Sequence, residues 1–66
     1  MPIQTFILEK NFESGIAVQM VRSTLARSDA GELTITKVGS EAVEVEVNVH
    51  NPLWMSWVED HFADFV

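Results

Sequence analysis

Apolar and polar residues alternate with the greatest regularity between residues 43 and 49. Every second position holds a valine, and glutamate or asparagine fills the positions between: Val43, Glu44, Val45, Glu46, Val47, Asn48 and Val49. A period of two sends successive side chains to opposite faces of a β-strand. The pattern therefore predicts a strand with one valine face in the core and one acidic face in water.

A second strand is predicted just before this one, around Leu33 and Ile35, and a turn near Gly39 would join the two as a hairpin. Residues that face each other across a hairpin share one side of the sheet, so apolar positions should oppose apolar positions. A three-residue turn over residues 38–40 meets this requirement and predicts three cross-strand pairs: Leu33 with Val45, Ile35 with Val43, and Lys37 with Glu41. A five-residue turn also keeps the faces matched, whereas a two-residue turn would set Ile35 against Glu44.

The segment Ile3–Glu9 also predicts a strand, because it is rich in β-branched and aromatic residues. Both of its faces are apolar, with Phe6 and Leu8 on one and Ile3 and Ile7 on the other. Strands with two apolar faces are typically covered on both sides. One layer of helices covers only one face, so we expect a second copy of the chain to cover the other and the protein to form a homodimer.

A helix is predicted between these strands, from an N-cap at Asn11 or Ser14 to about Asp29, with Gly31 in the left-handed conformation that ends it. The apolar stripe of this helix follows helical spacing and contains Ala17, Val18, Met20, Val21, Thr24 and Leu25. We interpret Met20 as core packing, the usual role of a methionine on such a stripe. The helix is therefore expected to be amphipathic, with one side on the sheet and the other in water.

A second helix is predicted to begin at Asn51 and to run to the end of the sequence, because Asn51 can cap the first turn and Pro52 lacks the N–H that would go unpaired there. Its apolar side is wide. The centre consists of Trp54, Val58, His61 and Phe65, one flank of Trp57, and the other of Met55 and Phe62. A small sheet cannot bury so wide an arc, so we predict that Trp57, Met55 and Phe62 bind a partner protein.

These elements follow the order strand, helix, strand, strand, helix in a single domain over residues 1–66. A right-handed crossover after the first strand, with the third strand inserted between the first two, gives a three-stranded antiparallel sheet in the order 1-3-2. Both helices then cover one face of the sheet. The predicted fold is a small α+β domain, β-α-β-β-α, and it resembles a ferredoxin-like unit without its fourth strand. Its first strand lies at an unprotected edge, where another chain can pair.

Composition narrows the classes of partner. The 66 residues carry ten acidic and four basic side chains, and the formal net charge of −6 would repel nucleic-acid phosphates and anionic lipid surfaces. We therefore expect no direct nucleic-acid binding and no membrane binding. The chain has no cysteine, so no disulfide can stabilise so short a domain, and oligomerisation or a partner protein is the remaining common support. Cytoplasmic localisation is the default expectation.

Candidate chemistry is sparse. The two histidines, His50 and His61, lack the i, i+4 spacing that places two imidazoles on one helical face for a metal. His61 lies on the apolar side of the last helix and is interpreted as a packed histidine with a hydrogen-bonded tip. The sequence contains no Gly-rich phosphate loop, no nucleophile elbow and no paired-cysteine motif. We therefore predict no catalytic residue, no metal site, no cofactor and no enzymatic activity.

An acid stripe on the open face of the sheet is the second candidate surface, besides the apolar flank of the last helix. It consists of Glu44 and Glu46, with Glu32 and Glu41 near the strand ends. A row of carboxylates can imitate a nucleic-acid backbone and occupy the basic groove of a partner. A purely solubilising surface is the alternative interpretation of the same residues.

The sequence thus predicts a small acidic binding protein that inhibits or modulates a macromolecular partner. A homo-oligomeric structural or assembly subunit is the alternative, because the same apolar surfaces could serve self-association alone. In size, acidity and α+β order the chain is similar to phage-encoded inhibitors of nucleic-acid enzymes and defence complexes, such as anti-restriction and anti-CRISPR proteins. That likeness is one of composition and not of motifs.

Overall fold

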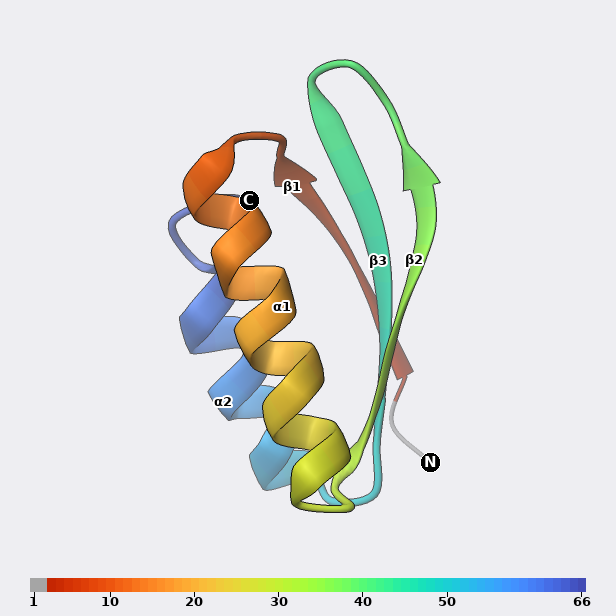
Figure 1. Cartoon of the computed structure of the whole chain (residues 1–66). Coiled ribbons are helices and arrows are strands. Elements are labelled where there is room, and N and C mark those ends of the chain that lie inside the picture. Colours follow the sequence, from red (N-terminus) through yellow and green to blue (C-terminus); the bar gives the residue numbers. More distant parts are fainter. Residues whose placement is uncertain (1–2) are drawn as a thin grey trace.

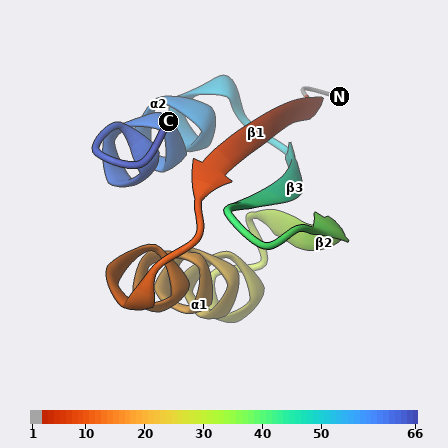
Figure 2. The same cartoon turned by 90° about the horizontal axis from the view of Figure 1, so that it is seen from above.

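The computed structural model describes residues 3–66 and contains three strands and two helices (Figure 1). In chain order these are β1 (Ile3–Glu9), α1 (Phe12–Arg27), β2 (Gly31–Val38), β3 (Ala42–Val49) and α2 (Pro52–Phe62). The strands form one antiparallel sheet in the order β1-β3-β2. Both helices lie on one face of this sheet (Figures 1 and 2). The predicted α+β fold, its element order and its sheet order are confirmed.

The valine face of β3 lies at the centre of the core. Val45, Val47 and Val49 are fully buried, and Val43 is half-buried against the same cluster, so the predicted assignment of the valines to the covered face is confirmed. Burial of one such side chain contributes about 1.5–3 kcal/mol. The helices supply the other half of the core: Ala17, Val18, Val21 and Leu25 from α1, and Met55, Val58 and Phe62 from α2.

The register of the β2–β3 hairpin differs from the predicted one by two residues at Leu33 and Ile35 and by three residues at Lys37. Ile35 lies opposite Val45, Leu33 opposite Val47 and Lys37 opposite Glu44, so the predicted pairing of Lys37 with Glu41 is wrong. A shift of two residues leaves Leu33 and Ile35 on the covered face, so face matching cannot distinguish the two registers at these positions. Lys37, by contrast, lies opposite Glu44 and therefore changes face. A β-bulge between Ile35 and Lys37 and a turn closed by a hydrogen bond from the Gly39 N–H to the Ala42 carbonyl (2.8 Å) determine the observed register.

The start of α1 is fixed by a capping box. Asn11 is the N-cap, and its Oδ1 accepts a hydrogen bond from the Ser14 N–H (2.8 Å). Ser14 Oγ in turn accepts from the Asn11 N–H (3.1 Å), so two backbone donors of the first turn are satisfied. These bonds explain why Ser14 can be buried at the sheet side of the helix.

The end of α1 differs from the prediction in one residue's role. The helix stops at Arg27, and Asp29, with φ 51°, takes the left-handed conformation that was predicted for Gly31. Gly31 is instead the first residue of β2. A Cβ atom at Gly31 would collide with the Asn48 carbonyl oxygen, so this glycine is needed for the close approach of β2 to β3.

The orientation of α2 corrects the predicted partner site. Met55 and Phe62 were predicted to bind a partner, but both are buried, and the Phe62 ring packs edge-to-face on Phe6 of β1 with centroids 5.2 Å apart. The buried residues of α2 are therefore Met55, Val58 and Phe62, whereas Trp54 is half-buried. The helix ends at Phe62, whereas it was predicted to run to the end of the sequence. Phe65, which was predicted to lie on the apolar stripe of this helix, is therefore outside it.

Candidate protein-binding surfaces

The side of the sheet opposite the helices is one candidate surface, which we call the open face (Figure 2). Register and strand alternation place these side chains on it: Ile3, Thr5 and Ile7 from β1, Glu44, Glu46 and Asn48 from β3, and Glu32, Thr34 and Lys37 from β2. Ile3 and Ile7, which we call the isoleucine pair, are 59% and 62% exposed. They confirm the prediction that β1 carries a second apolar face.

The acidic part of the open face is centred on Glu46. This exposed residue lies between Thr5 of β1 and Thr34 of β2. Glu32 lies opposite Asn48 and is therefore a diagonal neighbour of Glu46, about 7–8 Å away. Neither carboxylate has a cationic side chain as its cross-strand neighbour within the described strands, so this part of the face is uniformly negative.

Glu44 is the most restrained carboxylate of this face. It is half-buried, and its Oε2 accepts a hydrogen bond from Thr36 Oγ1 (2.9 Å), while Lys37 is its cross-strand neighbour. Glu41 lies outside β3, in the exposed turn before it, where its carbonyl accepts from the Lys10 N–H (2.9 Å). The structure thus brings together Glu32, Glu44 and Glu46, which we call the acid stripe, and leaves Glu41 at its end.

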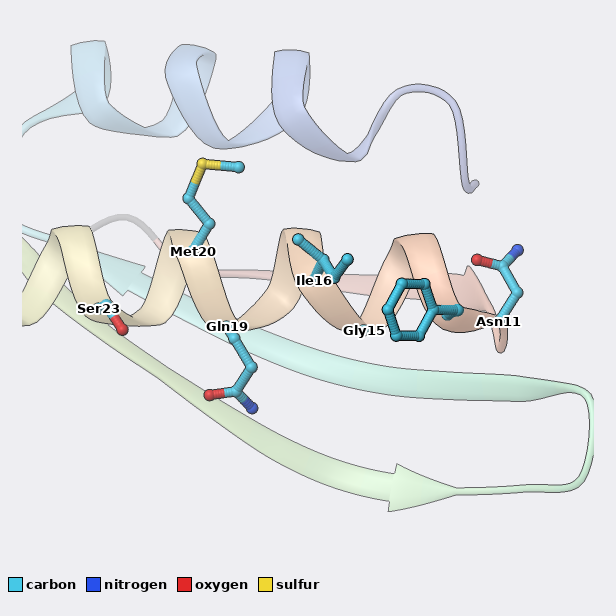
Figure 3. Close-up of a pocket in the computed structure, with 7 residues that line it drawn as sticks. Asn11, Gly15, Ile16, Gln19, Met20 and Ser23 are labelled. Carbon is cyan, nitrogen blue, oxygen red and sulfur yellow. The ribbon is translucent and has the colours of Figure 1, made fainter.

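The outer side of α1 forms a second apolar surface, which the sequence interpretation missed. Phe12, Ile16 and Met20 are 83%, 50% and 46% exposed, and they follow one another at intervals of four along the helix, with a shallow depression beside them (Figure 3). Residues at this spacing lie on one helical face. The interpretation of Met20 as core packing is wrong, because the helix turns Val21 and Leu25 to the sheet and Met20 towards α2 (Figure 3).

Trp57 lies on the flank of α2 that does not meet the sheet. It is half-buried, with the Trp54 ring centroid at 5.4 Å and the His61 ring centroid at 4.3 Å. Because a carbonyl only accepts, His61 Nδ1 must donate its bond to the Trp57 carbonyl (2.9 Å), in agreement with the packed, hydrogen-bonded histidine that was predicted. His61 and Phe65 also border a shallow groove against Ile16, Ala17 and Met20 of α1.

The predicted site residues therefore do not form one surface. Trp57 belongs to α2 in the helix layer, whereas the acid stripe lies on the other side of the sheet. The wide apolar arc of α2 contacts two neighbours, since Met55 and Phe62 are part of the core and His61 borders a groove with α1. Of the three flank residues, only Trp57 reaches the surface.

Between Ile3 and Val66, no three histidine or carboxylate side chains come together as a metal ion would require. No helix in this part of the chain is both long and apolar enough to cross a membrane. Comparison with protein families, with curated proteins and with solved structures found no match to this chain.

Proposed function

We propose that the protein is a non-catalytic binding protein whose open face docks on a cationic surface of a macromolecular partner and thereby inhibits or modulates that partner. One observation supports the proposal: a sheet face without a covering helix carries the acid stripe directly beside the isoleucine pair. Protein interfaces typically combine an apolar centre with a polar or charged rim. A net charge of −6 would add long-range attraction to a basic partner.

The acid stripe carries fewer charges per unit length than a strand of DNA does. Residues two positions apart on a strand, such as Glu44 and Glu46, are about 6.8 Å apart. One strand of B-DNA carries a phosphate about every 3.4 Å, so the stripe has about half that linear charge density. Electrostatic attraction would therefore steer the encounter, and burial of the isoleucine pair would supply much of the remaining free energy of binding.

The test is the double substitution Glu44→Lys with Glu46→Lys. The partner is first recovered by affinity capture from the native host and identified by mass spectrometry, and association is then measured by surface plasmon resonance. We expect the variant to associate at least tenfold more slowly at low salt and to lose most of the salt dependence of the rate. A partner that binds the variant at the parental rate would refute the proposal.

The matched control changes the same number of charges on the other layer. Asp60 and Asp64 are exposed residues in and just after α2, away from the sheet. Asp60→Lys with Asp64→Lys alters the net charge as much as the test variant does. Its association rate should fall less than threefold if the open face is the docking surface, because only the general attraction is reduced.

A homo-oligomeric assembly subunit is the second candidate function, and the exposed apolar side chains of α1 favour it. Phe12, Ile16 and Met20 form a continuous apolar row in an otherwise acidic chain. Sedimentation analysis distinguishes the two functions, because a large closed oligomer would support the subunit and a monomer or dimer would support the binding protein.

A further inference from the structure

The outer edge of β1 carries backbone groups that no neighbouring strand uses. In an antiparallel ladder, alternate residues direct both N–H and C=O to the neighbouring strand, and the residues between them direct theirs away. The Lys10 N–H donates to the Glu41 carbonyl (2.9 Å), which continues the β1–β3 ladder and assigns the even-numbered residues of β1 to β3. The N–H and C=O groups of Ile3, Thr5 and Ile7 therefore point to the outer edge.

The C-terminal segment closes one end of this edge. Glu9 follows the same alternation, and its outward N–H donates to the Phe65 carbonyl (2.7 Å). A further strand could not bond to Glu9 without displacing this segment. The accessible stretch of the edge therefore runs from Ile3 to Ile7.

The two edges of the sheet differ in how well they are protected. The β2 edge is interrupted by the bulge between Ile35 and Lys37, and it carries a lysine. Both features discourage pairing with another strand. In the described strand β1, by contrast, the register runs without a bulge from Ile3 to Glu9, and the strand contains neither proline nor lysine.

We propose that a second copy of the chain pairs with β1 in antiparallel orientation, with Thr5 of one copy opposite Thr5 of the other. A twofold arrangement of this kind sets Ile3 opposite Ile7 of the second copy and uses all three outward-pointing residues of each strand. A shift in one direction would set Ile3 against Glu9, whose N–H is already bonded to Phe65. A shift in the other direction would pair only Ile3 with Thr5 within the described residues.

The side chains on both faces of this edge agree with the proposed pairing. On the open face, the isoleucine pairs of the two copies, now more than half exposed, would become cross-strand neighbours and form one apolar cluster that remains on that face. On the helix side, Glu59 reaches Gln4 of β1 (3.4 Å), which places this flank of α2 beside the edge. Its neighbours on the flank, Ser56 and Ala63, are short and exposed.

The dimer would be a continuous six-stranded sheet with an isoleucine cluster at its centre and an acid stripe on each side. Two chains of net charge −6 repel each other, so dimerisation should strengthen as salt screens that repulsion. The opposite salt dependence is expected for binding of a cationic partner. The two proposals can therefore fail independently of each other.

Thr5→Cys tests the proposed register directly, because the chain contains no other cysteine. Hydrogen-bonded residues across an antiparallel pair have Cα atoms about 5.5 Å apart, which is within the range that a disulfide can bridge. Under mild oxidation, non-reducing electrophoresis should show a covalent dimer. We expect it to form at least tenfold faster in native buffer than in urea.

Thr34→Cys is the matched control, because Thr34 lies on β2 and flanks Glu46 just as Thr5 does from β1. Both side chains are exposed on the open face. The control should cross-link no faster in native buffer than in urea. Equal native rates for the two variants, or a faster rate for Thr34→Cys, would overturn the proposal.

Thr5→Pro supplies an independent measurement. Proline removes the outward N–H of Thr5 and leaves the hydrogen bonds to β3 intact. Edge strands tolerate proline at positions whose N–H points outward. Over a hundredfold rise in concentration, the mass of the parent should shift from the 7.4 kDa monomer towards twice that value, and its melting temperature should rise. The variant should remain monomeric and keep the circular dichroism spectrum of the parent. A parent that stays monomeric throughout, with an unchanged melting temperature, would exclude the dimer; if the variant unfolds, the cross-linking rates decide.

Discussion

The two faces of the sheet are built from alternate residues of the same strands, but only the covered face forms part of the hydrophobic core. On the covered face of β3, Val45, Val47 and Val49 have no exposed surface. On the open face of the same strand, Glu46 is exposed and Glu44 is half-buried. The backbone ladders are common to both faces, so the difference in burial comes from the side chains and from the helices above them.

This difference separates the residues that maintain the fold from those available for binding. A domain of this length has a stability of roughly 3–10 kcal/mol, so the loss of one core side chain is a large part of the total. Exposed residues of the open face contribute little and can change without unfolding the chain. An interface built there could therefore be altered while the domain stays folded.

The largest expected effect is that of Val45→Asp, which places a carboxylate in the covered face between Phe6 and Ile35. No cation lies on the covered face of the described strands, so the charge would be buried without a partner. We expect the variant to be unfolded at 25 °C, because the cost of several kcal/mol equals most of the stability. Circular dichroism and one-dimensional NMR measure this outcome.

Glu46→Val is the control at the next position of the same strand. It should keep the parental spectrum and change the free energy of unfolding by less than about 0.5 kcal/mol. A folded Val45→Asp protein, or an unfolded Glu46→Val protein, would show that the two faces had been assigned the wrong way round.

A smaller effect is expected from Phe62→Ala, which extends the comparison to the helix layer. Phe62 is fully buried and packs on Phe6, so its loss should destabilise the domain by about 3–5 kcal/mol in urea titrations. Trp57→Ala should cost less, about 1–2 kcal/mol, because Trp57 is only half-buried beside Trp54 and His61. If the two variants lost the same free energy of unfolding, Trp57 would be a core residue and would not be available to a partner.

Sequence reasoning succeeded where the periodicity of a pattern has only one structural meaning. The alternation along β3 assigns each residue to a face. Asn51 was predicted as an N-cap, and Asn11 was one of the two predicted candidates for the other, because capping chemistry is local. The register of the hairpin was missed because a shift of two residues keeps Leu33 and Ile35 on the same face. The β-bulge that determines this register depends on the geometry of both strands, and the sequence of one strand alone does not predict it.

The apolar residues of the helices were harder to place because a helix in a two-helix layer has two neighbours. Part of the arc of α2 meets the sheet and part borders α1, so its width did not require a partner, and Met55 and Phe62 are core residues. On α1, Phe12 and Ile16 share the four-residue spacing of Met20, and this signal could have identified the exposed row. Assignment of the row to the surface required the position of α2.

The smallest effect in this comparison is expected at Thr36, whose hydroxyl donates to Glu44 Oε2 (2.9 Å) on the open face. Thr36→Val keeps the shape of the side chain and removes the donor, and an exposed hydrogen bond of this kind contributes at most about 0.5–1 kcal/mol. Thr34→Val, on the same strand but without a side-chain bond among the described residues, serves as control and should change nothing measurable. Urea midpoints of both variants at unchanged slope test this difference. A loss above about 2 kcal/mol for Thr36→Val would mean that the open face also stabilises the fold, because the restrained Glu44 would then hold the bulged end of β2 to β3.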